Sequence, residues 1–581
     1  MFNHIQPLFH KILIFLIIII ISCLNAASPD PVFSENGMVV SLNEHASQAG
    51  IDILKKGGNA IDAAVAVGFT LAVTRPENGN IGGGGFVIGA TSDGKIFTQD
   101  HREKAPYLSK KDMFLDENNT VIPKMSIQSR ASSGVPGTVH GLLSIWTDHG
   151  SGNIRLQQLL SSAIRLAEKG FSLSHSQALL FNSYKNDFAL NKAASKIFIR
   201  KDDRPWKQGD RFLQKDLAKT LKRIAKFGID GFYKGHTAEL IVKEMQRGNG
   251  LITEYDLESY NSVYREPVIG SFRDIEVISM GPPSSGGLLL IHMLNALENF
   301  EIDTLGWNSS DYVHLVTEIA KRAYADRAQH LGDPDFWKNP RDMFLSKPYA
   351  KKRVSDISMN EFTPSKKVFP GDYEEKEGTE TTHYSVVDRY GNAVSITSTL
   401  NTNFGNKHVV EGAGFLLNNE MDDFSSKPGV PNKYGLIGNE FNSIEPNKRM
   451  LSSMSPTIVE NPEGKLFLIL GSPGGSTIIT TVAQIILNII EYGMNIKDAV
   501  EQPRFHHQWL PDFVYFEPFG FSVETLNALE KRGHTTTFRR SIGEANCIKI
   551  DYLEDLGKVN YRNSIYSGAA DSRRGASAVG Y

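Results

Sequence analysis

Two helices are predicted near the start of the chain from the spacing of its hydrophobic residues. Residues 46–56 have a helical pattern that ends at Gly57-Gly58, and Asn59 can cap a second helix over residues 60–73. The second segment is apolar on nearly every side, which is typical of a helix that is covered all round. We therefore expect it in the core.

A glycine-rich turn follows this helix. Gly82 to Gly85 precede the apolar residues 86–88, so we expect a close backbone approach that leads into a strand. Residues 89–95 have the spacing of a phosphate-binding loop, but Ile96 stands where Ser or Thr must bind magnesium. Residues 92–95 fit a hairpin turn better, which argues against a nucleoside triphosphatase.

The middle of the chain is mostly helical by the same criterion. Amphipathic spacing predicts helices over residues 156–167 and 217–227. The turn at residues 281–287, rich in proline and glycine, opens a helix over residues 288–297. A long helix is expected over residues 311–329, with its apolar residues on one side.

The pattern changes at residues 366–380, where acidic side chains replace apolar ones. Such a composition favours an exposed, mobile segment, and an ordinary surface linker would have the same composition. The next segments, 381–388 and 392–400, are rich in β-branched residues and are separated by three residues that end in Gly391. This pattern predicts a β-hairpin with a three-residue loop.

The predicted hairpin register brings two threonines together. If residues 388 and 392 flank the loop, Thr381 lies opposite Thr399, and their Cβ atoms are about 4.5–5.5 Å apart. A bulge would shift the register by one residue. Threonine is common in strands, so the hairpin alone does not distinguish a functional pair from a structural one.

Composition and charge narrow the class of protein. The chain has 581 residues, of which 40% are hydrophobic and 22% charged, as in ordinary globular proteins. The formal net charge is −3, so no overall basic field exists to attract a polyanion. We therefore expect no nucleic-acid partner.

The N-terminus predicts export. Residues 12–21 form an unbroken apolar run that is too short to span a bilayer, and Ala26-Ala27 suit cleavage, so residues 1–27 are interpreted as a signal peptide. The sequence Ile-Ile-Ser-Cys also resembles a lipoprotein cleavage site, which would leave a lipid anchor on Cys23. We expect a periplasmic or secreted protein without a membrane span. Either way Cys547 is the only cysteine left in the folded body, which excludes an intrachain disulfide there.

Several motifs occur in the order in which one family carries them. Thr381-Thr382-His383-Tyr384-Ser385-Val386-Val387-Asp388, followed by Gly391-Asn392-Ala393-Val394, resembles the start of the small subunit of the gamma-glutamyltransferases. The other motifs are Arg75-Pro76-Glu77-Asn78-Gly79-Asn80-Ile81, Pro282-Pro283-Ser284-Ser285-Gly286-Gly287, Leu417-Asn418-Asn419-Glu420-Met421-Asp422-Asp423-Phe424, Leu451-Ser452-Ser453-Met454-Ser455-Pro456-Thr457, Gly471-Ser472-Pro473-Gly474-Gly475 and Arg504-Phe505-His506-His507-Gln508-Trp509. The chain therefore resembles gamma-glutamyltransferases of the bacterial type over residues 30–581.

This resemblance implies an α/β fold, the four-layer αββα sandwich of the N-terminal nucleophile hydrolases. It also implies a precursor that cuts itself between Glu380 and Thr381. The large subunit would comprise residues 28–380 and the small subunit residues 381–581. The two would remain associated as a heterodimer.

The chemistry explains why the cut would activate the protein. A threonine hydroxyl is a weak nucleophile unless a base removes its proton, and the new α-amino group of Thr381, with a pKa of about 7.7–8.0, can serve as that base. By the resemblance, Thr399 would orient the Thr381 nucleophile. We expect neither a metal nor a cofactor. His506 and His507 are adjacent and cannot share a face of a strand or helix.

The resemblance also assigns a site for the zwitterionic end of a γ-glutamyl donor. It implies that the α-carboxylate is bound by Arg102, Ser452 and Ser453, and the α-ammonium by Asn401, Glu420 and Asp423. The oxyanion would be bound by the N–H groups of Gly474 and Gly475. Residues 428–439, with Tyr434, would form a lid over the pocket. Bacterial members often carry Gln at the Glu420 position. This difference affects ammonium binding more than the type of reaction.

The implied reaction transfers a γ-glutamyl group from glutathione or a related donor to water, an amino acid or a dipeptide, through an ester on Thr381. A cephalosporin or glutaryl acylase on the same scaffold is an alternative, but Glu420 and Asp423 would then face no ammonium. An uncleaved, inactive secreted binding protein is a second alternative. A capsule-processing relative is a third, and the lid-like segment argues against it.

Overall fold

The computed structural model describes residues 29–369, 381–427, 429–433, 435–436, 438, 440–553 and 564–581. The predicted signal peptide with Cys23, residue Glu380 before the predicted cut, and most of the acidic segment lie outside the described residues. None of the helices in the described ranges combines the length and hydropathy needed to cross a membrane.

Two seven-stranded antiparallel sheets form the centre of the molecule. The first has the order β19 (Ser577–Gly580), β2 (Gly37–Ser41), β10 (Thr382–Asp388), β11 (Ala393–Thr399), β3 (Gly84–Ala90), β4 (Ile96–Asp100) and β7 (Val263–Arg265). The second has the order β1 (Val32–Ser34), β18 (Ser564–Ala570), β17 (Asn546–Tyr552), β13 (Leu466–Leu470), β12 (Thr457–Glu460), β9 (Ile275–Ser279) and β8 (Val268–Phe272).

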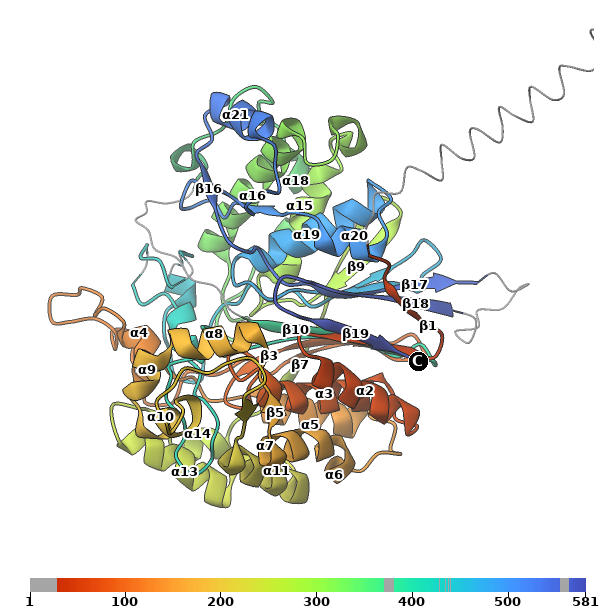
Figure 1. Ribbon diagram of the computed structural model, residues 1–581. Helices are drawn as coiled ribbons and strands as arrows, with labels where there is room; N and C mark the ends of the chain where they lie inside the picture. Colours follow the sequence, from red (N-terminus) through yellow and green to blue (C-terminus); the bar gives the residue numbers. More distant parts are fainter. Residues whose placement is uncertain are drawn as a thin grey trace, which may run out of the picture.

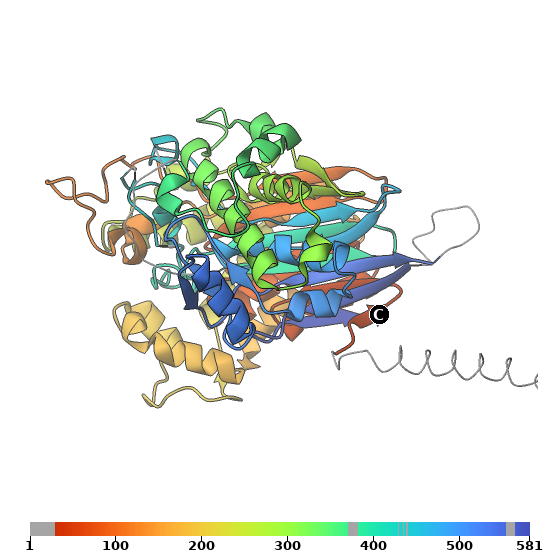
Figure 2. The ribbon, with the colours of Figure 1, turned by 90° about the horizontal axis from the view of Figure 1, so that it is seen from above.

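The two sheets pack face to face with a helical layer outside each of them (Figure 1). Buried side chains from both sheets, such as Val40, Val387 and Ile548, form the core between them. Seen from above, the strands run side by side beneath the outer helices and extend past them on one side (Figure 2). The αββα sandwich expected from the sequence is therefore confirmed.

The helices on the outer face of the first sheet come from the first half of the chain. They are α2 (Glu44–Lys55), α3 (Ala60–Thr74), α5 (Thr138–His149), α6 (Leu156–Leu159), α7 (Ser161–Lys169), α8 (His175–Ser183), α9 (Lys185–Ala189), α10 (Lys192–Phe198), α11 (Lys215–Phe227), α12 (Asp230–Tyr233), α13 (Gly235–Gln246) and α14 (Glu254–Glu258). The short α4 (Met125–Gln128) and the strand pair β5 (Phe171–Ser172) and β6 (Arg211–Phe212) accompany them.

The opposite face carries α15 (Gly286–Leu297), α16 (Ser310–His330), α17 (Arg341–Leu345), α18 (Lys347–Val354), α19 (Thr477–Ile490), α20 (Ile496–Glu501) and α21 (Val523–Lys531). A small sheet of β14 (Phe505–His506), β15 (Val514–Phe516) and β16 (Thr536–Phe538) lies on the same side. The 3-10 helices are Arg130–Ser132, Ile302–Leu305, Ser365–Lys367, Glu420–Asp423 and Glu440–Asn442.

The predicted elements agree with this structure in most places. Asn59 forms a capping box with Asp62 at the start of α3, whose residues are nearly all buried. The predicted helix over residues 156–167 is wrong in one respect, because it breaks at Leu160 into α6 and α7. Residues 91–95 form the expected turn between β3 and β4.

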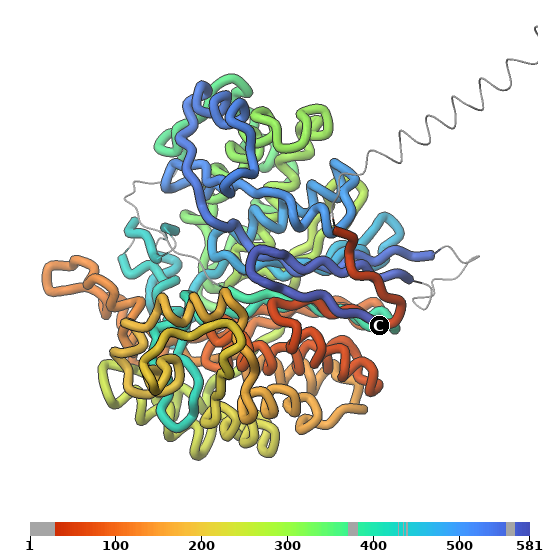
Figure 3. The backbone as a smooth tube through the Cα atoms, viewed as in Figure 1, coloured from red at the N-terminus to blue at the C-terminus, as the bar shows by residue number. Residues whose placement is uncertain are grey.

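Segments from both sides of residue 381 are interleaved in each sheet. In the first sheet, β10 pairs with β2 and β11 pairs with β3. The C-terminal strand β19 also pairs with β2, as the neighbouring red and blue ends of the tube show (Figure 3). A chain cut before Thr381 would therefore keep its ladder hydrogen bonds between the two parts.

Candidate active site

The hairpin β10–β11 has the register predicted from its loop. Thr382 pairs with Ser398 and His383 with Thr397, so Thr381 precedes the first pair and Thr399 ends the partner strand. Both threonines line one pocket of about 310 Å³. The other residues that line it are Arg102, Arg327, Asn401, Glu420, Asp423, Leu436, Leu451, Ser452, Ser453, Met454, Gly475 and Ile478.

Amide groups hold the two threonines in place. Asn78 donates from Nδ2 to the Thr381 carbonyl at 2.9 Å. Thr399 Oγ1 accepts the backbone N–H of Asn401 at 2.7 Å. Asn401 has a φ of 73°, a left-handed conformation that asparagine tolerates, and its Nδ2 donates to the Asn419 carbonyl. Thr381 is thus fixed at the start of a rigid strand.

The glycine turn before β3 packs against the end of β11. A Cβ atom on Gly83 would lie 1.9 Å from the Thr399 carbonyl oxygen, and one on Gly82 would lie 2.0 Å from the Leu416 carbonyl oxygen. Side chains at these positions are therefore excluded by backbone atoms. The structural role predicted for these glycines is consistent with this packing.

We expect Gly83→Ala to reduce activity about 100-fold, because the new methyl group must displace the Thr399 backbone. A displacement of a reacting group by about 1 Å lowers the rate by about that factor. Amine release from a γ-glutamyl anilide, per amount of folded protein, measures it. Gly94→Ala is the control, since no atom lies within 4 Å of a Cβ there and its φ of +83° adds only local strain. Equal activity of both variants would contradict this packing argument.

Arg102 lies just beyond β4 at the centre of a buried charge cluster. Its Nη1 donates to Glu420 Oε1, and its Nη2 donates to Asp423 Oδ2 at 2.5 Å. Glu103 lies 3.8 Å from Nη1. The residues predicted to bind the two charges of a zwitterion are thus brought together and contact one another here.

Burial dominates the titration of this cluster. Burial raises the pKa of Glu420 well above its ordinary value, although the charge of Arg102 opposes the shift. Burial also raises the pKa of Asp423, and it raises the pKa of Glu103 to about 8, again against the effect of Arg102. Three carboxyl groups around one guanidinium make a site that favours an additional cation.

Gly474 and Gly475 form the turn that leads into α19. Their φ angles are 137° and 57°, which a residue with a side chain adopts only with strain. Gly475 lines the pocket, whereas Gly474 is adjacent to it in sequence. The turn lies one residue before the N-terminus of α19, where backbone N–H groups and the helix dipole favour a negative charge.

Ser452 and Ser453 are held by the Pro282–Ser285 segment. The Ser452 N–H donates to the Pro283 carbonyl, and its own carbonyl accepts the N–H and the hydroxyl of Ser285. Both serines line the pocket. The motif around Pro282 therefore supports the site without lining it.

The predicted lid is described only in part. Tyr434 and Pro428 lie outside the described residues. Leu436 lines the pocket, and Asn432 donates from Nδ2 to Asp423 Oδ1 at 2.9 Å. The described residues Asn432 and Leu436 thus lie at the charge cluster and the pocket, and the lid stays a prediction.

The sequence analysis missed two residues of helix α16. Tyr324 donates its hydroxyl hydrogen to the Ser476 carbonyl beside the glycine turn. Arg327 lines the pocket one turn later. A signal for Arg327 was present, because it falls on the buried stripe that includes Ala320 and Ala323, where a charged residue is unusual.

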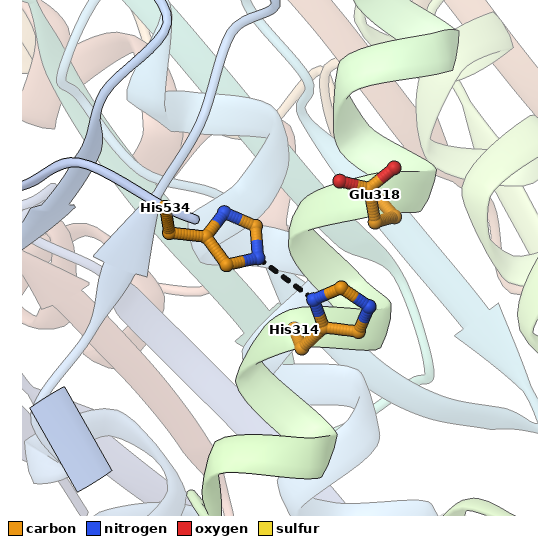
Figure 4. Close-up of side chains that lie close together, drawn as sticks. All are labelled: His314, Glu318 and His534. Carbon is orange, nitrogen blue, oxygen red and sulfur yellow. Dashed lines mark hydrogen bonds between the residues drawn. The ribbon is translucent and has the colours of Figure 1, made fainter. Parts of the chain in front are cut away.

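One group of described residues could hold a metal ion, and it lies outside the pocket. His314, Glu318 and His534 place a ligand atom each within 4.8 Å of one another (Figure 4). The imidazoles already hydrogen-bond to each other, and Glu318 accepts from Lys321 and Arg322. These contacts explain the cluster as a buried polar network between α16 and the loop that joins α21 to β16.

Comparison with known proteins finds the family that the sequence motifs resemble. The family model described as Gamma-glutamyltranspeptidase matches residues 46–581. The chain is 47% identical to the "Glutathione hydrolase proenzyme" of Escherichia coli K12 over 520 residues, which is 90% of this chain and 89% of that protein.

Two solved structures are similar. The Helicobacter pylori gamma-glutamyltranspeptidase is 43% identical with a TM-score of 0.56, covering 61% of this chain and 99% of that chain. The cephalosporin acylase of Bacillus halodurans has a TM-score of 0.83 and 24% identity, covering 96% of this chain and 98% of that chain. The second likeness concerns the fold alone.

Proposed function

The chain belongs to the gamma-glutamyltranspeptidase family, and on this premise we propose that it is a glutathione hydrolase that cuts itself before Thr381 and then transfers γ-glutamyl groups. The observation that carries the proposal is the single pocket shared by Thr381, Thr399, Arg102, Glu420 and Asp423. It combines a nucleophile that can become N-terminal with groups for both charges of a glutamyl donor.

In the first half-reaction the α-amino group of Thr381 takes the hydroxyl proton. Thr381 Oγ1 then attacks the γ-carbonyl of the donor, and the N–H groups of Gly474 and Gly475 stabilise the oxyanion. The tetrahedral intermediate collapses with cleavage of the amide bond. The proton passes to the leaving amine, and a γ-glutamyl ester remains on Thr381.

The second half-reaction uses the same groups in reverse. Water, or the amine of an amino acid or dipeptide, gives its proton to the Thr381 amino group and attacks the ester carbonyl. Collapse of the intermediate returns the proton to Thr381 Oγ1. The products are glutamate after hydrolysis, or a new γ-glutamyl compound after transfer.

The charge cluster would select the donor. Arg102, with Ser452 and Ser453, would bind the α-carboxylate. Asn401, Glu420 and Asp423 would bind the α-ammonium. An acyl group without an ammonium would leave the three buried carboxyl groups of Glu103, Glu420 and Asp423 with Arg102 as their shared cation, which disfavours the acylase alternative.

We expect the KM for a γ-glutamyl donor to rise as the pH falls below about 8. Burial raises the pKa of Glu103 to about 8 and that of Glu420 above its ordinary value, so these groups take up protons as the pH falls. The protonated groups then attract the donor ammonium less strongly. KM measured from pH 9 to pH 6 tests this, with Glu420→Gln as the variant in which the dependence weakens. A KM that is constant over this range would contradict it.

Release of a chromogenic amine tests the proposed function. We expect release from a γ-glutamyl anilide and much slower release from a glutaryl anilide, which has the carboxylate without the ammonium. Preference for the glutaryl compound would support the acylase instead. Release from neither, by an uncut chain, would support the inactive binding protein.

The interleaved strands support a heterodimer of residues 28–380 and 381–581, since β10 and β11 pair with strands from the other part. The apolar run at residues 12–21 supports export to the periplasm or the medium. The measured mass of the mature large subunit distinguishes the two forms of export. Cleavage near Ala26-Ala27 gives an unmodified subunit, whereas an anchor on Cys23 gives a longer subunit with the added mass of a lipid.

A further inference from the structure

Arg327 is a second buried guanidinium in the pocket, and it differs from Arg102 in its partners. Arg102 contacts two carboxylates, those of Glu420 and Asp423. Arg327 donates from Nε to the Ser285 hydroxyl at 2.8 Å and from Nη2 to the Ser453 hydroxyl at 3.5 Å. Among the described residues it forms no ion pair.

The environment of Arg327 makes it attractive to an anion. It is only 4% exposed. Burial lowers the pKa of Arg327 to about 10; Tyr324 and Asp423 oppose this shift, and the charge of Arg102 adds a smaller part to it. The group therefore stays cationic at neutral pH. A buried cation without a direct counter-ion is costly, and an anionic ligand would remove that cost.

The position of Arg327 identifies the part of the donor that it can reach. It hydrogen-bonds Ser453, which lines the pocket beside Ser452. Its helix also contacts the glycine turn, because Tyr324 donates to the Ser476 carbonyl. Arg327 therefore lies on the same side of the pocket as the serines. An anion bound to Ser453 would lie within reach of it.

We propose that Arg327 binds the α-carboxylate of the donor together with Ser453, and that it determines the preference for donors with a carboxylate on the α-carbon. This inference rests on the proposed function. The charge of Arg102 is shared with Glu420 and Asp423, so Arg327 supplies a second positive charge to the carboxylate beside that of Arg102. Arg102 then lies between the groups that bind the donor carboxylate and the groups that bind the donor ammonium.

The test compares two anilides that differ only in the carboxylate. A γ-glutamyl anilide carries both charges, whereas a 4-aminobutanoyl anilide lacks the α-carboxylate. We expect Arg327→Gln to lower kcat/KM for the γ-glutamyl compound about 10- to 100-fold, the range for a hydrogen bond to a charged group. The value for the 4-aminobutanoyl compound should change less than about threefold. Arg327→Lys should restore part of the loss.

Two controls separate this role from a structural one. Arg322→Gln makes the same change on the same helix, at a buried arginine that pairs with Glu318 and Asp356 instead of lining the pocket. It should affect both anilides equally. Self-cleavage on a denaturing gel reports whether each variant folds.

An Arg327→Gln protein that cuts itself but loses activity on both anilides by the same factor would overturn the inference, since that is the result of a structural role. So would unchanged activity on the γ-glutamyl compound. Failure of the unaltered protein to release the γ-glutamyl anilide would instead overturn the proposed function.

Discussion

Thr381→Ala is expected to leave one uncut chain and to reduce amine release from a γ-glutamyl anilide by at least about 10⁴-fold. The substitution removes the hydroxyl that attacks both the preceding peptide bond and the donor, and loss of a nucleophile typically has an effect of this size. A denaturing gel and the anilide assay measure the two results. Thr381→Ser keeps an oxygen nucleophile and should still cut itself.

Thr382→Val is the matched control, one residue along the same strand. Its hydroxyl is buried without a hydrogen-bond partner, so valine can replace threonine there at little cost. Thr382 lines a different cavity, with His101 and Tyr384. We expect this variant to be cut and active. A cut and active Thr381→Ala protein would exclude Thr381 as the nucleophile.

Arg102→Ala should lower kcat/KM for the γ-glutamyl anilide about 10³-fold. The change removes a partner of the α-carboxylate, and it also leaves Glu103, Glu420 and Asp423 without the guanidinium that favours their ionised forms. Loss of the guanidinium raises the pKa of these carboxyl groups further, so they bind the donor ammonium less well. Two charge-assisted contacts, at about 1.5–3 kcal/mol each, account for the factor.

The same substitution breaks a buried ion pair, which costs about 3–5 kcal/mol of folding free energy. Arg102→Lys is therefore measured beside it, because it keeps the charge and loses the two-pronged geometry. We expect both proteins to cut themselves if they fold, and the lysine variant to bind the donor better. Unchanged donor affinity in the alanine variant would contradict the assignment of Arg102.

The hairpin shows what the sequence can predict. A three-residue loop that ends in Gly391 fixes the register of its two strands, so Thr381 and Thr399 could be paired before the structure was known. The buried helix α3 was also predictable, because Asn59 marks its start and its apolar residues leave no polar face. Local chemistry determines both features.

Arg327 shows where such prediction ends. The sequence predicts its helix, but the pocket forms only when α16 packs beside the serine loop and the glycine turn, which lie far away in the chain. The split between α6 and α7 at Leu160 has a similar origin, since hydrophobic spacing continues across it. The placements of Arg102 against Glu420 and Asp423 came from family resemblance, because no local pattern joins residues that distant.

The most direct test of self-activation at Thr381 is a denaturing gel of the purified protein with N-terminal sequencing of the smaller band. We predict two bands, the smaller of 201 residues beginning Thr-Thr-His-Tyr. A single uncut band in a preparation that releases amine from the γ-glutamyl anilide, or a smaller band that begins elsewhere, would contradict it.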